Sequence, residues 1–304
     1  MRRRPVRRRS TPVVLGVLLA VLLGYVGLGR VQEGPVPVTA GPAIAWPVQG
    51  QAAYTTSVLD AIRADGVEGP VPIASVTKVM TAYVVLQERP LEQGEAGATI
   101  PVTGADVADM QRRQANGESV VAVAAGEDLT QLQALYALML PSANNVAVLL
   151  ARSTAGSVDA FVELMNRAAD DLGMDDTVYT DPSGMADDTV STAADQVRLF
   201  DAALRDPVFA AVAGATAAEL PVAGTVVTTS RLLGQDGFVA GKTGSHDAAG
   251  GCYVFRVVRT VAGREVVITG AVLGQRGGPY IEAALRAAEA LTAQVAASPD
   301  VRAG

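Results

Sequence analysis

Three side chains that commonly carry enzyme chemistry are scarce in this sequence: 304 residues include one cysteine, one histidine and two lysines. Cys252 has no partner within the chain, which excludes an internal disulfide and a cysteine-rich metal site. His246 would have to be the general base of any Ser-His-Asp hydrolase. Because a lone loop histidine is more often a solvated side chain, the composition argues against such a triad.

The two lysines are unusual because every other one of the 24 basic residues is arginine. Both lie in short motifs, Ser75-Val76-Thr77-Lys78 and Lys242-Thr243-Gly244. The pKa of arginine is too high for it to act as a base, whereas a buried lysine can lose its proton. A codon bias toward arginine would leave lysines at arbitrary positions, so these neighbours favour a chemical role for both.

The N-terminus has the layout of an export signal or a membrane anchor. Six arginines within the first ten residues precede Val13 to Gly29, an uncharged and mostly aliphatic run. The only A-x-A-like cleavage site, Val38-Thr39-Ala40, lies some ten residues past this run, which is a loose fit to the layout of a cleaved signal peptide. We therefore favour an uncleaved anchor in residues 1–30, which places the remainder on the extracytoplasmic face of the cell membrane; cleavage would instead give a secreted protein.

Residues 31–42 are rich in proline and glycine and are predicted to be a linker, followed by one domain over 43–297 and a tail over 298–304. Residues 1–30 contain seven arginines and no acid, so without them the net charge changes from −7 to −14. Such an acidic body repels polyphosphates, which argues against nucleic-acid binding.

Apolar periodicity predicts an α+β fold. The expected helices are Ser75–Gln87, Leu129–Leu140, Asn145–Arg152, Val158–Leu172, one beginning at a Thr192/Asp195 capping box, and Tyr280–Ala297. The expected strands are Phe238–Lys242, Cys252–Val261, Arg264–Leu273, and a hairpin of Ala43–Pro47 with Gln51–Thr56. Strands at both ends with helices between them imply an antiparallel sheet completed by distant segments and flanked by helices.

Ser75 and Lys78 are one helical turn apart, so their side chains share a face at a helix N-terminus. Acting as a base at neutral pH requires the lysine pKa to fall by roughly three units from about 10.4. Burial, a second lysine and the positive end of the helix dipole all act in that direction. Alone, this S-x-x-K pattern is equally consistent with a solvated helix start.

Two further motifs make the pattern specific. Ser142-Ala143-Asn144 lies in a break between two expected helices, where it could be an N-cap or could face a cleft. Lys242-Thr243-Gly244 ends an apolar stretch, where an edge strand could present its backbone to an extended peptide. Gly244 permits an approach that a side chain would block.

The ordered trio S-x-x-K, S-x-N and K-T-G resembles the penicillin-binding D-alanyl-D-alanine carboxypeptidases of the serine β-lactamase/transpeptidase-like superfamily. The resemblance includes PIASVTKVMTAYVVL, AGEDLTQLQALYALMLPSANNVA and GKTGSHDAAGGC and covers about residues 43 to 295. It implies an antiparallel sheet flanked by helices with an inserted, mainly helical subdomain. The chain departs from the pattern at Asn145, where many relatives carry an acid, and at Ser245-His246.

On this resemblance Ser75 is the nucleophile, Lys78 accepts its proton, and Ser142 with Lys242 relays that proton to the leaving amine. Substrate would be held by Asn144, Lys242, Thr243, Gly244 and Ser245, with the backbone N–H groups of Ser75 and Ser245 forming the oxyanion hole. The implied substrate is a peptidoglycan stem peptide ending in D-Ala-D-Ala, and β-lactams would be covalent inhibitors. Neither a metal nor an organic cofactor is implied.

Three alternatives use the same motifs: a D,D-endopeptidase, a class A β-lactamase and a non-catalytic penicillin sensor. The β-lactamase needs an E-x-x-L-N motif, to which Glu163-Leu164-Met165-Asn166 is a near miss inside an expected helix. A sensor would usually need more than the nine residues that precede Ser10. Asp175-Asp176 and Asp187-Asp188 are interpreted as solvated loops, and residues 90–120, with Arg112 and Arg113, receive no role.

Overall fold

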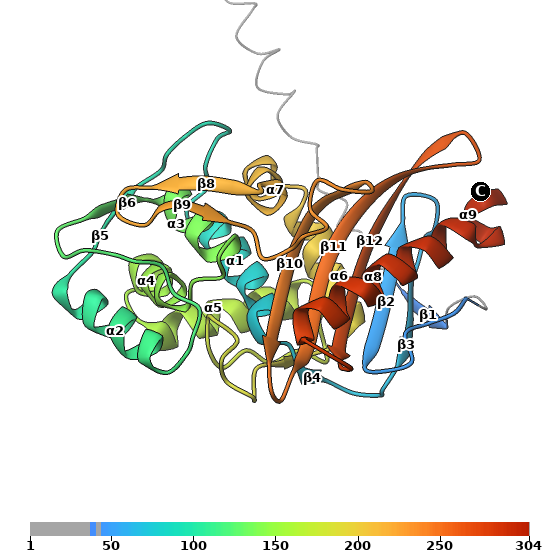
Figure 1. The fold of residues 1–304 in the computed structure, drawn as a ribbon, viewed down its shortest axis with the longest axis horizontal. Coiled ribbons are helices and arrows are strands. Elements are labelled where there is room, and N and C mark those ends of the chain that lie inside the picture. The colour runs from blue at the N-terminus through green and yellow to red at the C-terminus, as the bar shows by residue number, and fades with distance from the viewer. Residues whose placement is uncertain (1–36, 41–43, 304) are drawn as a thin grey trace, which may run out of the picture. The chain divides into compact units, whose positions relative to one another are not determined.

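A six-stranded sheet is the frame of the protein in the computed structural model, which describes residues 37–40 and 44–303. The strand order is β1-β3-β2-β12-β11-β10, with bounds Val38–Ala40 (β1), Gln51–Thr56 (β2), Ile62–Gly66 (β3), Phe238–His246 (β10), Gly250–Val261 (β11) and Arg264–Gln275 (β12). Neighbours are antiparallel except β1 and β3. Strand β2 lies beside β12 (Figure 1), which confirms the expected closure of the sheet by distant segments.

The two faces of the sheet are covered by different helices. Alternation along β11 sends Tyr253, Phe255 and Val257 into the cluster formed with α8 (Tyr280–Ala297), whereas Cys252 and Val254 join the core on the opposite face. Helix α6 (Ala193–Ala203) packs on that opposite face. Because both faces are buried, β11 has an almost continuous apolar sequence.

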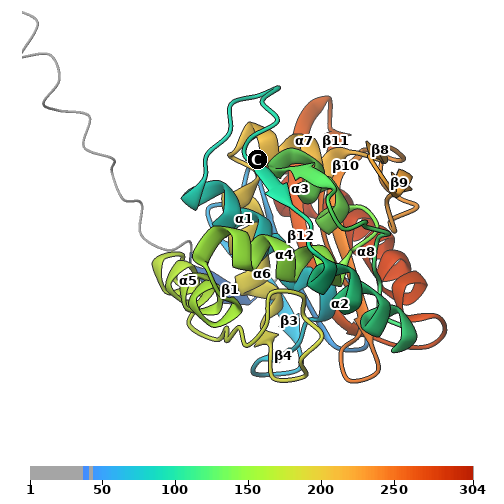
Figure 2. The same ribbon diagram turned by 90° about the vertical axis from the view of Figure 1, so that its left-hand side faces the viewer.

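A mainly helical layer makes up the rest of the part that the structure describes (Figure 2). Its helices are η1 (Ala74–Thr77, a 3₁₀ turn), α1 (Lys78–Glu88), α2 (Gly104–Ala115), α3 (Gln131–Met139), α4 (Asn144–Ala155), α5 (Val158–Asp171) and α7 (Pro207–Gly214), and α9 (Pro299–Ala303) follows α8. Three small sheets pair β4 (Val71–Pro72) with β7 (Val190–Ser191), β5 (Thr99–Pro101) with β6 (Asp128–Thr130), and β8 (Ala217–Leu220) with β9 (Gly224–Val227). This architecture is the α+β fold predicted from the sequence.

Two predicted elements near the start differ from the structure. The hairpin of Ala43–Pro47 with Gln51–Thr56 was wrong, because β2 pairs with β3 on one side and β12 on the other. Within the predicted linker, Val38–Ala40 forms β1, since its backbone pairs with the otherwise open edge of β3. The apolar run Val13–Gly29 lies outside the described residues. Within 37–40 and 44–303, no helix has the length and apolarity to cross a membrane.

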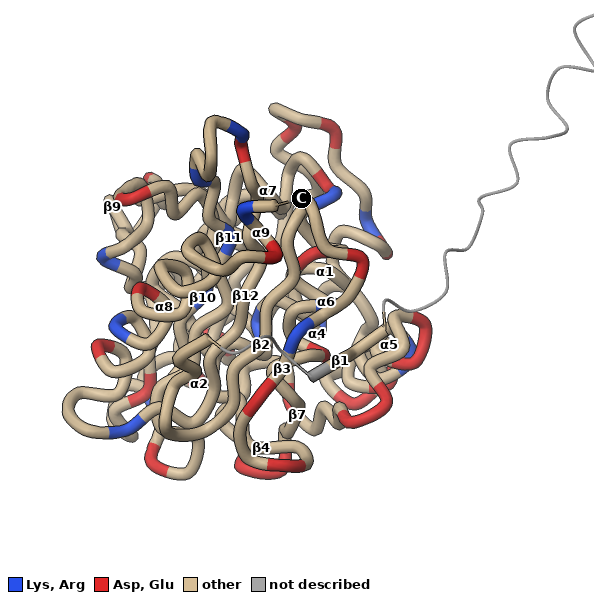
Figure 3. Tube along the Cα trace, turned by 90° about the vertical axis from the view of Figure 1, so that its right-hand side faces the viewer, with Lys and Arg blue, Asp and Glu red and all other residues tan. Residues whose placement is uncertain are grey.

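Charged residues are distributed unevenly over the described chain. Figure 3 shows acidic segments in the loops around β4, β7 and α5. The only lysines, Lys78 and Lys242, are both buried. The two side chains singled out by composition are therefore removed from the solvent.

Candidate functional site

The nucleophile candidate Ser75 lies in η1, not in the regular α-helix that the sequence predicted. Ala74, the residue before it, has a backbone φ of 48°, a left-handed conformation that costs free energy in a residue with a Cβ. Helix α1 begins only at Lys78. The tighter 3₁₀ turn still places Ser75 and Lys78 on one face, because side chains three residues apart eclipse in that geometry.

The Lys78 ammonium group has a complete set of acceptors. Nζ donates to Ser75 Oγ at 2.7 Å, to Asn144 Oδ1 at 2.7 Å and to the Ser183 carbonyl at 2.8 Å. A neutral amine has two hydrogens and one lone pair. If those hydrogens stay on Asn144 and Ser183, the lone pair is directed at the Ser75 hydroxyl, which is the geometry of a general base.

Burial makes the neutral form of Lys78 accessible. Its side chain is completely buried, and this desolvation, followed by the positive charge of Lys242, lowers the pKa of Lys78 well below 10.5. Asp181 and Glu118 oppose that shift, whereas Arg113 adds to it. Desolvation is the largest cause, so the enclosure of the side chain itself favours the uncharged lysine.

The second lysine joins the same site from the edge strand β10. Lys242 Nζ donates to Ser142 Oγ at 2.9 Å and to the Thr243 carbonyl at 2.7 Å, and burial lowers its pKa to about 7. Ser142 lies between α3 and α4 with a φ of 65°. This left-handed backbone in a non-glycine residue is typical of positions held for function. The predicted S-x-N break is confirmed.

Gly244 brings β10 into direct contact with η1. A Cβ on this residue would lie 2.8 Å from the backbone nitrogens of both Ser75 and Val76. Strand β10 is at the end of the six-stranded sheet, as the sequence predicted. Its backbone therefore borders the nucleophile on one side, and an extended peptide could pair with the strand there.

The hydroxyl groups at the end of β10 have different surroundings. Thr243 is buried and shares a hydrogen bond with Thr229 Oγ1, while Ser245 is partly exposed. The Thr229 backbone N–H in turn donates to the Leu140 carbonyl at 3.2 Å. Sequence reasoning missed Thr229, because a threonine in a loop has no distinguishing pattern.

The loop of residues 181–185 was also missed, although Lys78 depends on it. Asp181 Oδ2 accepts from the backbone N–H groups of Ser183 at 3.0 Å and Gly184 at 2.9 Å, which fixes the turn that presents the Ser183 carbonyl. Thr81 Oγ1 donates to the neighbouring Pro182 carbonyl at 2.6 Å. An aspartate-proline turn looks like an ordinary surface loop in the sequence.

Other singled-out residues take structural roles. His246 Nδ1 accepts from the Ala249 N–H at 3.3 Å and lies 3.5 Å from Asp187, while the Ser75 hydroxyl faces Lys78. In the near-miss motif, Glu163 is largely exposed on α5 and pairs with Arg167 at 3.8 Å. Both hydrogen-bonding ends of the Asn166 amide bind the backbone of Tyr179.

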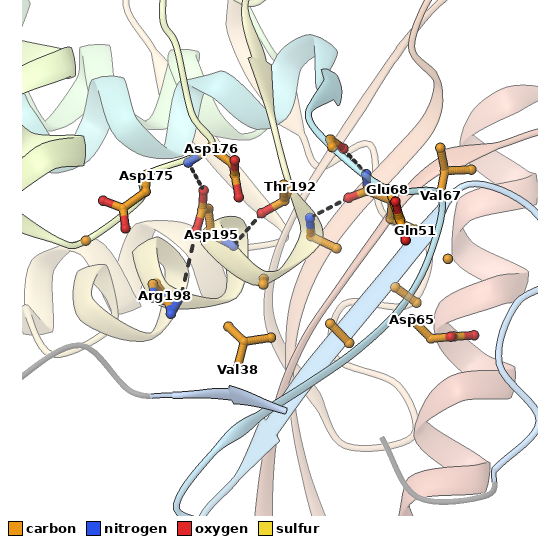
Figure 4. A pocket seen from close by; sticks show the side chains of 17 residues that line it. Val38, Gln51, Asp65, Val67, Glu68, Asp175, Asp176, Thr192, Asp195 and Arg198 are labelled. Atoms are coloured by element: carbon orange, nitrogen blue, oxygen red, sulfur yellow. Dashed lines mark hydrogen bonds and ion pairs between the residues drawn. The ribbon is translucent and has the colours of Figure 1, made fainter. Parts of the chain in front are cut away.

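A separate acidic cavity of about 440 Å³ lies between β3 and the start of α6 (Figure 4). Its polar groups serve the fold: Asp195 accepts from the Asp176 N–H at 3.2 Å and from Thr177 Oγ1 at 2.9 Å, and Gln51 Oε1 accepts from the Ala193 N–H at 2.9 Å. Asp175 and Asp176 are exposed, as predicted. In the ranges that the structure describes, no group of three potential metal ligands gathers.

The chain is similar in sequence to known proteins. The family model described as D-alanyl-D-alanine carboxypeptidase matches residues 53–276. The chain is 35% identical over 254 residues to the D-alanyl-D-alanine carboxypeptidase DacB2 of Mycobacterium tuberculosis, covering 81% of this chain and 80% of that one. A D-alanyl-D-alanine endopeptidase of Pseudomonas aeruginosa is 35% identical over 138 residues, but the match spans only 41% of its length and 45% of this chain.

The fold is also similar to a solved structure. The crystal structure of the Streptomyces K15 DD-transpeptidase superposes with a TM-score of 0.71 and 25% sequence identity, over 83% of this chain and 98% of that chain. The similarity spans both the sheet and the helical layer, because it covers most of each molecule. The expected fold is therefore confirmed.

Proposed function

Because the chain belongs to the D-alanyl-D-alanine carboxypeptidase family, we propose that it removes the terminal D-alanine of peptidoglycan stem peptides through an acyl-enzyme on Ser75. The observation that carries this proposal is the contact between the completely buried Lys78 Nζ and Ser75 Oγ at 2.7 Å. A hydroxyl activated by a neutral amine is a nucleophile suited to acyl transfer. β-Lactams would acylate the same oxygen.

In the acylation step, Lys78 takes the Ser75 proton while Oγ forms a bond to the carbonyl carbon of the penultimate D-alanine. The backbone N–H groups of Ser75 and Ser245 would stabilise the oxyanion, each donor being worth about 3–4 kcal/mol in comparable sites. Asn144 keeps Lys78 directed at the hydroxyl through its Oδ1 atom. The Lys78 ammonium that results keeps three acceptors, so the product of proton transfer is also solvated by the protein.

The leaving group is the amine of the terminal D-alanine, which must gain a proton as the peptide C–N bond breaks. Ser142 and Lys242, joined by the 2.9 Å hydrogen bond, are placed to pass that proton. The pKa of Lys242, lowered to about 7 by burial, suits both donation and acceptance near neutral pH. Thr243 and Ser245 hydroxyls would bind the terminal carboxylate beside the edge strand.

A water molecule then hydrolyses the Ser75 ester and restores the serine. A class A β-lactamase would speed this step with a glutamate, but the candidate Glu163 is exposed on α5, where it pairs with Arg167. Penicillin should therefore leave Ser75 slowly. Rapid penicillin turnover by the purified protein would favour the β-lactamase alternative.

A second candidate is cleavage of D,D-crosslinks, supported by the similarity to the Pseudomonas aeruginosa protein named an endopeptidase. The same residues would act on a longer leaving amine. The open edge of β10 could bind either substrate, because backbone pairing is independent of the length of the leaving group. Crosslinked and uncrosslinked substrates must be compared directly.

A proposal for the cellular location rests on the sequence of residues 1–30. We propose that six arginines followed by the apolar run Val13–Gly29 tether the domain to the extracytoplasmic face of the cell membrane. Peptidoglycan lies on that side, so the tether would hold the site near its substrate. Membrane fractionation of the full chain, with protease added to intact cells, distinguishes a tether from a cleaved, secreted form.

One experiment tests the function and its alternatives together. The purified protein is treated with a labelled penicillin, the adduct is located by peptide mass, and D-alanine release is measured from a D-Ala-D-Ala pentapeptide and from a crosslinked dimer. We expect an adduct on Ser75 and release from the pentapeptide. Labelling without release from either substrate would indicate a penicillin sensor, and cleavage of the dimer alone an endopeptidase.

A further inference from the structure

Behind Asn144 lies a chain of charged side chains that the motifs do not include. Glu118 Oε2 accepts a hydrogen bond from Asn144 Nδ2 at 2.9 Å and another from Arg113 Nη1 at 2.7 Å. Arg113 Nε also donates to Asp109 Oδ2 at 2.7 Å. The side chains of Arg113 and Glu118 are only 17% and 12% exposed. Because both side chains are largely buried, this ion pair is not an ordinary solvated surface pair.

Glu118 determines which way the Asn144 amide points. An ionised carboxylate can only accept hydrogen bonds, so the Asn144 atom facing it must be the NH₂ group. The carbonyl oxygen of the same amide then faces Lys78, to which it is bonded at 2.7 Å. In the flipped orientation the NH₂ group would face the lysine amine and compete for its lone pair. The carboxylate thus selects the amide orientation that leaves this lone pair for Ser75.

The segment that carries Glu118 is attached to the start of α4 at several points. The Asn144 N–H donates to the Ser119 carbonyl at 2.8 Å. Asn145 Oδ1 accepts from the Val121 N–H and Asn145 Nδ2 donates to the Val121 carbonyl, both at 3.1 Å. An acid at 145 could make only the first of these two side-chain bonds. The departure at Asn145 therefore helps to hold Glu118 in place.

Arg113 offsets the charge of Glu118. Alone, a carboxylate near Lys78 would favour the ammonium form and weaken the base. The charged groups acting on Lys78 are Lys242 from β10, Asp181 from the 181–185 loop, and Arg113 with Glu118 from α2 and the segment after it. Arg113 lowers the pKa of Lys78 whereas Glu118 raises it. The pair supplies an orienting acceptor at little net electrostatic cost to the base.

We propose that Glu118 and Arg113 are positioning residues for acylation: Glu118 holds the Asn144 amide with its oxygen toward Lys78, and Arg113 neutralises the Glu118 charge. The inference rests on the proposed function, because it assumes that Lys78 activates Ser75. It assigns a role to part of the segment 90–120. It also predicts two separable effects, one of geometry and one of charge.

The test measures the rate of acylation by a fluorescent penicillin between about pH 5 and 10 for the full chain and its variants. Arg113→Ala should shift the acid limb, the part of the pH–rate profile where the rate rises with pH, to a pH about one unit higher. The reason is that the negative charge of Glu118 is then no longer neutralised and raises the pKa of Lys78. Glu118→Ala should lower the rate about tenfold or more across the whole range, because the Asn144 amide can flip. Glu118→Gln keeps an acceptor without the charge and should retain the plateau while moving the acid limb downward.

The double variant Arg113→Ala/Glu118→Gln is the sharpest comparison, because it removes both charges and keeps an acceptor. Its acid limb should return toward the wild-type position. Arg112→Ala is the matched control: Arg112 is 65% exposed, pairs with the same Asp109, and should leave the profile unchanged. A role in folding alone would change thermal unfolding without moving the acid limb.

An unchanged acid limb in Arg113→Ala, or a full plateau rate in Glu118→Ala, would overturn the inference. If Arg113→Ala does not fold, the downward shift in Glu118→Gln tests the charge effect by itself, and its absence is equally decisive. A wild-type protein that penicillin does not acylate would instead contradict the proposed function. The two failures are therefore distinguishable.

Discussion

Lys78 and Lys242, the only two lysines of the chain, share one buried site: burial is the largest cause that lowers the pKa of Lys78, and the positive charge of Lys242 is the next. Each also holds a serine: Lys78 Nζ contacts Ser75 Oγ at 2.7 Å and Lys242 Nζ contacts Ser142 Oγ at 2.9 Å. Because the two ammonium groups repel one another, protonation of one disfavours protonation of the other. A positive charge on Lys242 therefore favours the neutral form of Lys78.

Replacing Lys78 by Arg should abolish acylation, with a loss of roughly a hundredfold to ten-thousandfold, the range typical of a general base. The substitution keeps a positive charge but removes any base that can titrate. The measurement is the rate of penicillin adduct formation on Ser75. Adduct formation at the wild-type rate would eliminate Lys78 as the base.

Lys242→Arg should reduce the same rate less than Lys78→Arg. A guanidinium at 242 can still donate to Ser142 Oγ and to the Thr243 carbonyl, the two acceptors that Lys242 uses. Charge is the larger part of its role in binding a terminal carboxylate. Equal losses in the two variants, both shown to be folded by circular dichroism, would contradict this division.

Lys242 should also make stability depend on pH in a defined direction. Burial lowers its folded-state pKa to about 7, whereas the unfolded value is about 10.4. Between these values the unfolded chain binds more protons, so the free energy of unfolding rises with pH by about 1.4 kcal/mol per unit. We expect denaturant titrations to show this rise in the wild type relative to Lys242→Met. A pH-independent difference between the two would refute it.

Gly244→Ala should impair acylation about a hundredfold, because displacement of a reacting group by about 1 Å commonly costs that much. The added Cβ would lie 2.8 Å from the backbone nitrogen of Ser75, so β10 and η1 must separate. Gly104→Ala serves as the control, since a Cβ added at this position of α2 would meet no atom within 4 Å. Equal acylation rates in the two variants would show that the close approach is unnecessary.

Asn145→Asp should destabilise the fold by about 1–3 kcal/mol, because the Val121 carbonyl would lose its buried donor. Chemical denaturation measures the loss directly. Asn116→Asp, at the exposed end of α2, is the comparison and should have little effect. A stable Asn145→Asp variant would mean that Val121 finds another donor.

The sequence revealed the reacting residues of the site more completely than the groups that hold them in place. Ser75, Lys78, Ser142 and Lys242 stood out because each belongs to a motif and the lysines are scarce. The Ser183 carbonyl could not be recognised, because a backbone acceptor leaves no mark on the residue type. Residues 90–120, which include Glu118 and Arg113, received no role from the sequence, and only the burial of this pair in the fold distinguishes it.

The elements of the fold were also predicted unequally well from the sequence. Helix α8 and strand β12 begin where predicted, and β11 begins two residues earlier, at Gly250, because their apolar patterns are long and sharply bounded. Helix α2 was missed, since its polar surface lacks an apolar stripe, although Thr103 and Asp106 form a capping box at its start. The partner of β2 was predicted wrongly because pairing depends on distant segments and not on local alternation.

The three acceptors of Lys78 include groups 66 and 105 residues farther along the chain. A chain emerging from synthesis or partly unfolded has none of this enclosure, and its lysines are ordinary solvated cations. The reactive amine is thus a product of completed folding, so immature copies are chemically silent toward both peptides and drugs. Penicillin labelling would accordingly count finished molecules, which makes the antibiotic a probe of the folding yield.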